Sequence, residues 1–213
     1  MKEDKFITAV LKGTGYAKEN TQGVLLVVVA LVVIIAGIVI WRSHIANKQE
    51  NAQSKLGIAQ IAYQDGQFLE AKDSLLSLVN GYGKTESAHV GMFLLGHLYY
   101  AIGIRDSAGI FWNDFLKTGF EDKDLQAAAK AGLAAIQSDN GNYMNAAETY
   151  KDLYSEYPDY FNRGDWIFKA AENYLAAGEK GKAREFFQKF IDEYGENPRV
   201  QNAKIIVAEL NAQ

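Results

Sequence analysis

Four glycine residues recur along the chain at an almost constant interval. They are Gly66, Gly103, Gly141 and Gly178, and they are separated by 37, 38 and 37 residues. A repeated interval of about 20–50 residues is typical of a chain built from similar structural units that stack in a row. This interval restricts the fold more than any other feature, because every unit must have nearly the same length and turn at the same place.

The residues around each glycine repeat as well. A small residue precedes each glycine by seven positions: Ala59, Gly96, Ala134 and Ala171. An alanine follows each glycine by five positions: Ala71, Ala108, Ala146 and Ala183. Large residues follow at nine positions, as Leu75, Trp112, Tyr150 and Phe187, and at twelve, as Leu78, Phe115, Leu153 and Phe190. This pattern predicts helices that approach closely at the small residues and fill the space between units with the large ones.

Each unit is therefore expected to be a helix pair with the glycine in its turn, where glycine costs little sterically. One pair cannot bury its own apolar face, so the pairs must stack into an α-solenoid. Only two prolines occur, which also favours helices. Pro198–Ala212 carries apolar residues on one face and is predicted to be a helix that caps the open end of the stack.

The repeats resemble the tetratricopeptide repeat, whose pattern is Trp-x2-Leu-Gly-x2-Tyr, then Ala-x3-Phe, then Pro. The second unit carries Leu95-Gly96-x2-Tyr99 and Ala108-x3-Trp112, and Pro158 ends the third unit. The interval exceeds the usual ~34 residues, and the terminal Pro occurs only once. The resemblance implies an all-α protein with about four such helix pairs.

An uninterrupted apolar segment precedes the repeats. Residues 24–40 read VLLVVVALVVIIAGIVI, and with Gly23 and Trp41 the segment has 19 residues. A helix of that length spans about 28 Å, close to the ~30 Å thickness of a bilayer core. A cleavable signal peptide has a shorter apolar core and a small-x-small site, whereas this segment ends in the bulky Ile40-Trp41-Arg42. We therefore predict a transmembrane anchor.

Charges that flank this segment are nearly balanced, with four lysines before it and three basic residues after it. This slightly favours a cytoplasmic N-terminus, and a short basic tail before a long domain is typical of an anchor that leaves its domain outside. The expected organisation is a tail over residues 1–22, a transmembrane helix over 23–41, a polar helical linker over 42–55, a repeat domain over 56–197 and a capping helix over 198–213. In the tail, Phe6, Ile7, Val10 and Leu11 predict a short interfacial helix.

Composition excludes several functions. The absence of cysteine excludes disulfides, a thiol nucleophile and the lipid-bearing cysteine of a lipoprotein. Residues 42–213 have a net charge of −5, which argues against nucleic-acid binding. No nucleophile-elbow, phosphate-loop or His-Glu-x-x-His motif is present, and His89 and His97 lack a third ligand nearby in the sequence. We expect no catalytic site, no metal and no cofactor.

The tetratricopeptide resemblance implies that the first helix of each pair lines a concave surface. Alignment of these helices predicts a peptide-binding groove lined by Gln60, Tyr63, Phe93, His97, Tyr100, Phe168, Glu172 and Leu175. The set is aromatic and polar, and it lacks the Lys, Arg and Asn with which some family members clamp acidic C-terminal peptides. Such a groove favours apolar or helical peptide segments.

The order of tail, apolar span and repeats, with the segment Val39-Ile40-Trp41-Arg42-Ser43-His44, resembles membrane-anchored periplasmic tetratricopeptide proteins of bacteria. These include the YfgM-like ancillary subunit of the Sec translocon. The resemblance implies a non-catalytic scaffold on the periplasmic side of the inner membrane, in contact with the translocon and periplasmic chaperones. Two alternatives stay open: an envelope-assembly or cell-division coordinator, and a regulatory sensor or enzyme accessory that faces the cytoplasm.

Overall fold

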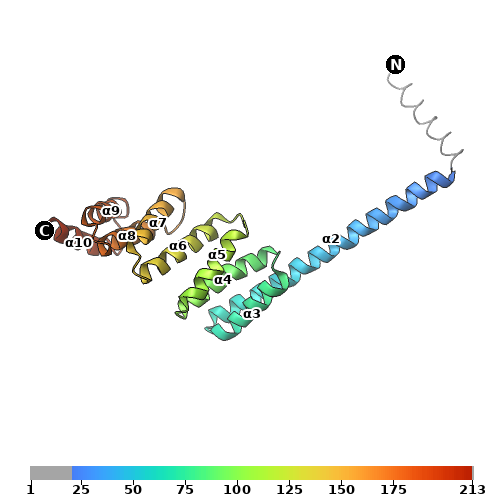
Figure 1. Cartoon of the computed structure of the whole chain (residues 1–213), viewed down its shortest axis with the longest axis horizontal. Coiled ribbons are helices and arrows are strands. Elements are labelled where there is room, and N and C mark those ends of the chain that lie inside the picture. Colours follow the sequence, from blue (N-terminus) through green and yellow to red (C-terminus); the bar gives the residue numbers. More distant parts are fainter. Residues whose placement is uncertain (1–20, 213) are drawn as a thin grey trace, which may run out of the picture. The chain divides into compact units, whose positions relative to one another are not determined.

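The computed structural model describes residues 21–212, and this range contains helices and no strand. The helices are α2 (Thr21–Gln64), α3 (Phe68–Tyr82), α4 (Glu86–Ala101), α5 (Arg105–Lys117), α6 (Lys123–Asp139), α7 (Tyr143–Glu156), α8 (Arg163–Ala176), α9 (Lys180–Glu193) and α10 (Val200–Asn211) (Figure 1). The all-α class predicted from the sequence is confirmed. The predicted tail lies outside the described residues except for its last two, and its apolar stripe lies wholly outside them.

The chain divides into two compact units, one up to Asn51 and one from Ala52 onward. In the first unit, the apolar side chains from Val24 to Trp41 are almost all exposed along α2. Within residues 21–212, α2 is the one helix that is long and apolar enough to cross a membrane. The polar residues 42–55 continue the same helix.

The second unit is a row of helix pairs. Consecutive helices from α3 to α10 pack against each other, and α4 also contacts α6. Ala59 and Ala62 of α2 share a core cluster with Leu75 of α3 and Leu95 of α4. A second cluster joins α4 to α6, and a third extends from α6 to α10. Burial between neighbours along the row is the arrangement expected of a solenoid.

The four periodic glycines end the first helix of each pair. Their φ angles are 76°, 82°, 78° and 83° in chain order, in the left-handed region that glycine adopts without steric cost. At Gly103 the glycine N–H donates to Tyr100 O at 3.0 Å, and the next N–H, of Ile104, donates to Tyr99 O at 2.8 Å. The other three turns have the same two bonds, which define the Schellman motif.

The predicted core positions are confirmed. All four small residues, all four alanines and all eight large residues of the repeating pattern are buried. The capping helix is also confirmed, because Val200, Ala203 and Val207 of α10 are buried against the third cluster. Pro198 does not itself join α10, which begins two residues later.

Candidate functional site

A hollow of about 500 Å³ lies between the first helices of the second, third and fourth pairs, α4, α6 and α8. Its floor belongs to α6, which contributes Ala128, Ala131, Gly132 and Ala135. These residues are three or four positions apart and therefore share one helix face. Because their side chains are the smallest available, the middle helix leaves open the space that larger side chains would fill.

The α4 wall of the hollow is aromatic. Phe93, His97 and Tyr100 follow one another at helical spacing and all line the hollow. The Phe93 and His97 ring centroids are 4.9 Å apart, and the His97 ring stands edge-on to Trp112 at 5.5 Å. His97 is exposed as a whole residue, while the surrounding side chains partly desolvate its imidazole and lower the pKa of His97 below 6.5. The imidazole is therefore neutral at pH 7.

The opposite wall is a stack of three rings from α8 and the loop before it. Tyr160 stacks on Trp166 with centroids 4.3 Å apart, and Phe161 lies against Tyr160 at 4.8 Å. Trp166 is buried in the core, whereas Phe161 is 88% exposed at the outer end of the stack. An exposed aromatic ring beside a hollow is typical of a surface that binds a partner.

A smaller hollow of about 230 Å³ continues from the first one, since both are lined by Tyr100, Ala135, Tyr150 and Lys169. It is more polar. The Tyr100 hydroxyl donates to Asp139 Oδ2 at 3.1 Å, and Arg105 Nε donates to the same oxygen at 2.6 Å. Burial and the Asp139 carboxylate raise the pKa of Tyr100, so its phenol remains a hydrogen-bond donor.

Carboxylates outnumber basic groups on the two hollows. Asp124, Asp139, Asp165 and Glu172 line them, whereas Lys169 is the basic residue among the lining residues. Asp139 is paired with Arg105 and Asp165 with Arg199, and neither arginine lines either of these two hollows. Burial raises the pKa of Glu172, and nearby Lys169 opposes that shift. The lining is thus acidic as well as aromatic.

Only part of the predicted groove comes together. Phe93, His97 and Tyr100 line the larger hollow, and Glu172 lines the smaller one beside Tyr100. Phe168 is only 3% exposed, edge-on to Phe187 and Phe190, so its ring belongs to the core.

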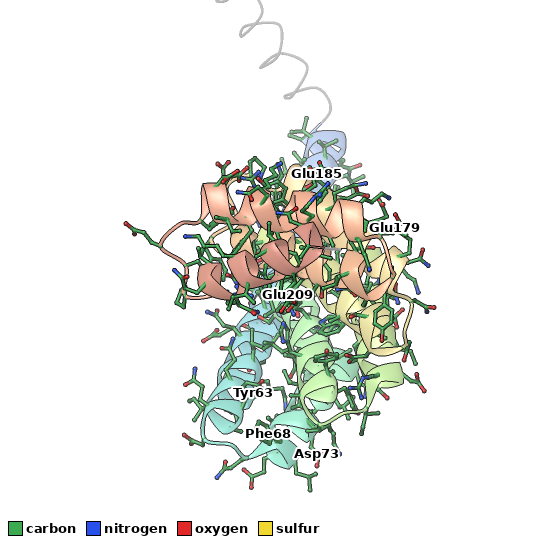
Figure 2. The ribbon with its side chains drawn as sticks, turned by 90° about the vertical axis from the view of Figure 1, so that its left-hand side faces the viewer. Tyr63, Phe68, Asp73, Glu179, Glu185 and Glu209 are labelled. Atoms are coloured by element: carbon green, nitrogen blue, oxygen red, sulfur yellow. The ribbon has the colours of Figure 1, made fainter. Side chains whose placement is uncertain are left out.

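The other three predicted groove residues lie outside both hollows. Leu175 is partly buried and packs against the core cluster of α6–α10. Gln60 and Tyr63 are exposed on α2. Tyr63 packs edge-on against Phe68 across the α2–α3 turn, with centroids 5.5 Å apart (Figure 2). A position aligned to the repeat faces the hollow only where the neighbouring helix leaves it uncovered.

Two parts of the site were not predicted from the sequence. The floor residues of α6 fall in the alanine-rich run from Ala127 to Ala135, which could have indicated a helix that leaves space beside it. The stack of Tyr160, Phe161 and Trp166 lies outside the repeating core positions and depends on the path of the loop between α7 and α8. No periodic signal marks that path.

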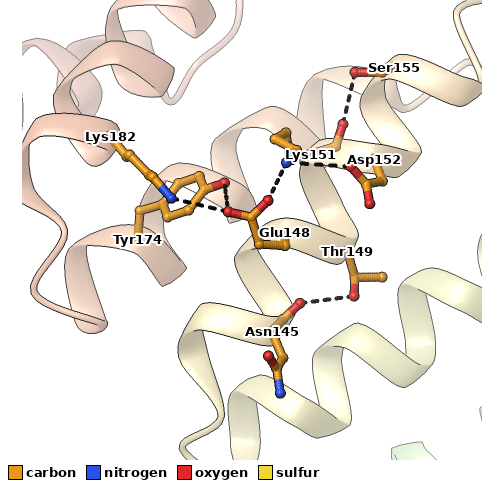
Figure 3. A network of polar contacts seen from close by, with 8 residues as sticks. All are labelled: Asn145, Glu148, Thr149, Lys151, Asp152, Ser155, Tyr174 and Lys182. Carbon is orange, nitrogen blue, oxygen red and sulfur yellow. Dashed lines mark hydrogen bonds and ion pairs between the residues drawn. The ribbon is translucent and has the colours of Figure 1, made fainter.

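A polar network on α7, α8 and α9 holds α8 in place (Figure 3). The Glu148 carboxylate accepts from Lys151, from the Tyr174 hydroxyl at 2.9 Å and from Lys182 Nζ at 3.2 Å. These donors, Lys151 first, lower the pKa of Glu148 from 4.5 to about 2. Because Glu148, Tyr174 and Lys182 lie on three successive helices, this one carboxylate links the third and fourth pairs.

Stacked helix pairs, glycine turns, a terminal helix and a hollow between the first helices define a helical-repeat protein. A tetratricopeptide repeat-like domain profile matches residues 15–165, more than half of the chain, and a tetratricopeptide repeat profile matches residues 167–197. The chain belongs to the tetratricopeptide repeat-like domain family.

Solved structures show the same fold. A tetratricopeptide repeat protein from Parabacteroides merdae superposes with a TM-score of 0.65 at 15% identity, covering 76% of this chain and 61% of that one. The nearly identical TPR-like repeats of a Podosopora anserina protein superpose with a TM-score of 0.61 at 17% identity, covering 75% of this chain and 84% of that one. Pseudomonas aeruginosa PilF superposes with a TM-score of 0.57 at 16% identity, covering 77% of this chain and 69% of that one. At these identities the likeness concerns the fold alone.

The sequence matches none of the curated proteins with which it was compared. Tetratricopeptide repeats are generally non-catalytic scaffolds for protein interaction, and the matches indicate no catalytic family. Among residues 21–212, no group of three or more His, Asp or Glu side chains is placed to hold a metal ion.

Proposed function

We propose that this protein is a non-catalytic, membrane-tethered scaffold that binds a protein or peptide segment in the hollow between α4, α6 and α8. The aromatic lining supports this most strongly: two aromatic walls face an open space above a floor of alanine and glycine. A ligand that removes apolar surface of this kind from water stabilises the complex by about 25 cal/mol per Å² of buried apolar area. Ordinary core packing does not account for Phe161, which stands 88% exposed.

The membrane tether is the second part of the proposal. The exposed apolar stretch of α2 has the length of a bilayer-spanning helix. Tethering raises the local concentration of a ligand that is itself at the membrane, without any new contact. The resemblance in the arrangement of tail, span and repeats supports a periplasmic domain at a bacterial inner membrane, close to the Sec translocon and periplasmic chaperones.

Site-specific photo-crosslinking in cells tests the binding role. A crosslinker at Phe161, beside the hollow, is compared with one at Ile205, which is exposed on α10. We expect discrete adducts from residue 161 only, with translocon subunits or periplasmic chaperones recovered by immunoblotting. Envelope-assembly or division proteins would instead favour the alternative coordinator role. Equal adducts from both positions, or none from residue 161, would refute binding at the hollow.

Topology needs a separate test. A reporter active only in the periplasm and one active only in the cytoplasm are each fused after Gln213. We expect activity from the periplasmic reporter and retention of the full-length chain in the membrane fraction after alkaline washing. Activity from the cytoplasmic reporter would overturn the proposed location. The binding role is tested separately by the crosslinking experiment.

A further inference from the structure

We propose that the hollow between α4, α6 and α8 recognises a peptide segment in which a large apolar side chain stands beside a lysine or arginine. This inference rests on the proposed function, since it names the chemistry of the ligand of the same site. The larger hollow takes the apolar side chain, and the carboxylates that line the two hollows take the cation.

Shape and lining select the apolar side chain. The hollow of about 500 Å³ lies over alanine and glycine and has aromatic rings on both sides. An inserted aromatic or large aliphatic side chain would contact rings on the α4 side and the stack of Phe161, Tyr160 and Trp166 on the other. Aromatic pairs with centroids about 4.5–7 Å apart add stabilisation beyond area burial. A small or polar side chain would leave this space unfilled.

Charge selects the cation. The lining contributes four carboxylates and the single ammonium of Lys169. Arg105 and Arg199 pair with Asp139 and Asp165 from outside the hollows and offset much of their charge, so the negative charge open to a ligand comes mainly from Asp124 and Glu172. Asp124 and Glu172 form no ion pair within the part of the chain that the structure describes.

A basic ligand residue therefore meets complementary charge, and its aliphatic stem and cationic head both suit an aromatic wall. An acidic peptide would face repulsion from a surface that already carries excess negative charge. The charge of the lining thus separates this site from tetratricopeptide grooves that clamp acidic C-termini through basic residues.

Fluorescence anisotropy with the full-length chain in detergent micelles tests this chemistry. The probes are three labelled dodecapeptides on one alanine-serine background, which carry Trp-Lys, Trp-Glu or Ala-Lys at their centre. We expect Trp-Lys to bind about tenfold or more tightly than either of the others, and its affinity to fall as salt is added. Equal affinities for Trp-Lys and Trp-Glu, or no binding of Trp-Lys, would overturn the inference.

Two exposed residues supply variants that should leave the fold intact. Asp124→Asn is expected to reduce the preference for Trp-Lys over Trp-Glu several-fold, whereas Phe161→Ala should weaken both peptides. Glu209→Gln and Ile205→Ala, both exposed on α10 outside the hollows, are matched controls and should change nothing. A preference that survives Asp124→Asn unchanged would contradict the role of the carboxylates.

The outcome separates this inference from the proposed function. Cellular adducts at residue 161 together with indifference to peptide charge would retain the scaffold and reject the cationic ligand. Loss of both the adducts and peptide binding would reject both.

Discussion

Gly132 lies against the six-membered ring of the Trp112 indole, so closely that a Cβ atom at residue 132 would come within 2.5 Å of Cη2. At the five-membered ring of the same indole, a Cβ atom at Gly96 would come within 2.4 Å of Cδ1. Trp112 therefore fills the gap between α4 and α6, and two glycines accommodate it. The close approach of these helices depends on the absence of both Cβ atoms.

Gly132→Ala should destabilise the protein. Alanine favours a helix by about 1 kcal/mol over glycine, but overpacking against a buried ring costs about 1–3 kcal/mol. We expect a net loss of about 1 kcal/mol in urea unfolding of the full-length chain in a non-ionic detergent, followed by circular dichroism. Gly57→Ala on α2 is the matched control, because a Cβ atom added there would have no neighbouring atom within 4 Å. That variant should be neutral or stabilising, and similar losses in both would contradict the role of Trp112.

Gly103→Ala should lower stability for a different reason. Its φ of 82° is a left-handed conformation, which costs a residue with a Cβ atom about 1–2 kcal/mol. No atom would obstruct the Cβ, so the loss measures backbone strain alone. Gly103→Asn should lose less, because asparagine tolerates this region better. An order of stability with alanine above asparagine would argue against the strain explanation.

Glu148→Gln should lower stability at neutral pH and matter little in acid. The pKa of Glu148 falls from 4.5 to about 2 on folding, so its contribution is complete above pH 4.5 and is lost as the pH falls toward 2. Because the Glu148 side chain is 37% exposed and its charge is screened by solvent, we expect Glu148→Gln to lose about 0.5–1 kcal/mol of stability at pH 7. Unfolding from pH 7 to pH 2.5 checks this, with Glu209→Gln, exposed on α10, as control (Figure 2). If the stability difference between the unchanged protein and Glu148→Gln grew in acid, the stabilising role of this network would be contradicted.

Arg199→Ala should loosen the capping helix. The guanidinium pairs with Asp165 of α8 and lies over the Phe168 ring at 4.7 Å from its centroid. We expect a loss of about 1–2 kcal/mol and faster amide hydrogen exchange along α10. Arg199→Lys should recover only part of this loss, because lysine lacks the planar group that stacks on the ring. Lys204→Ala on the exposed face of α10 is the control, and equal exchange in all variants would contradict this role.

Much of the architecture could be predicted from the sequence because it depends on local and periodic properties. A glycine at each interval predicted the left-handed turns, and small and large residues at fixed offsets predicted the buried positions. The apolar stretch before the repeats predicted a transmembrane helix, and α2 is long and apolar enough to cross a membrane. Each of these features follows from backbone sterics or from the hydrophobicity of neighbouring residues.

The site could be predicted only in part. Phe93, His97 and Tyr100 line one hollow because they share one face of a single helix, and their part in a peptide-binding groove stays a prediction. Phe168 occupies the position equivalent to Phe93 and both rings are buried, but only Phe93 lines the hollow, whereas α9 and Arg199 pack against Phe168. Equivalent repeat positions thus differ in whether they border the hollow when the neighbours that follow them differ.

The sequence by itself determined the repeat length, the turns, the core positions and the apolar helix, since each depends on residues close together along the chain or at a regular interval. The tertiary structure alone decided where the hollow lies. Its floor exists because α6 presents alanine and glycine to a space bounded by two other helices, and its outer wall exists because one loop stacks Phe161 and Tyr160 on Trp166. Such a space depends on the volumes of side chains that meet from distant parts of the chain, and no single helix encodes it.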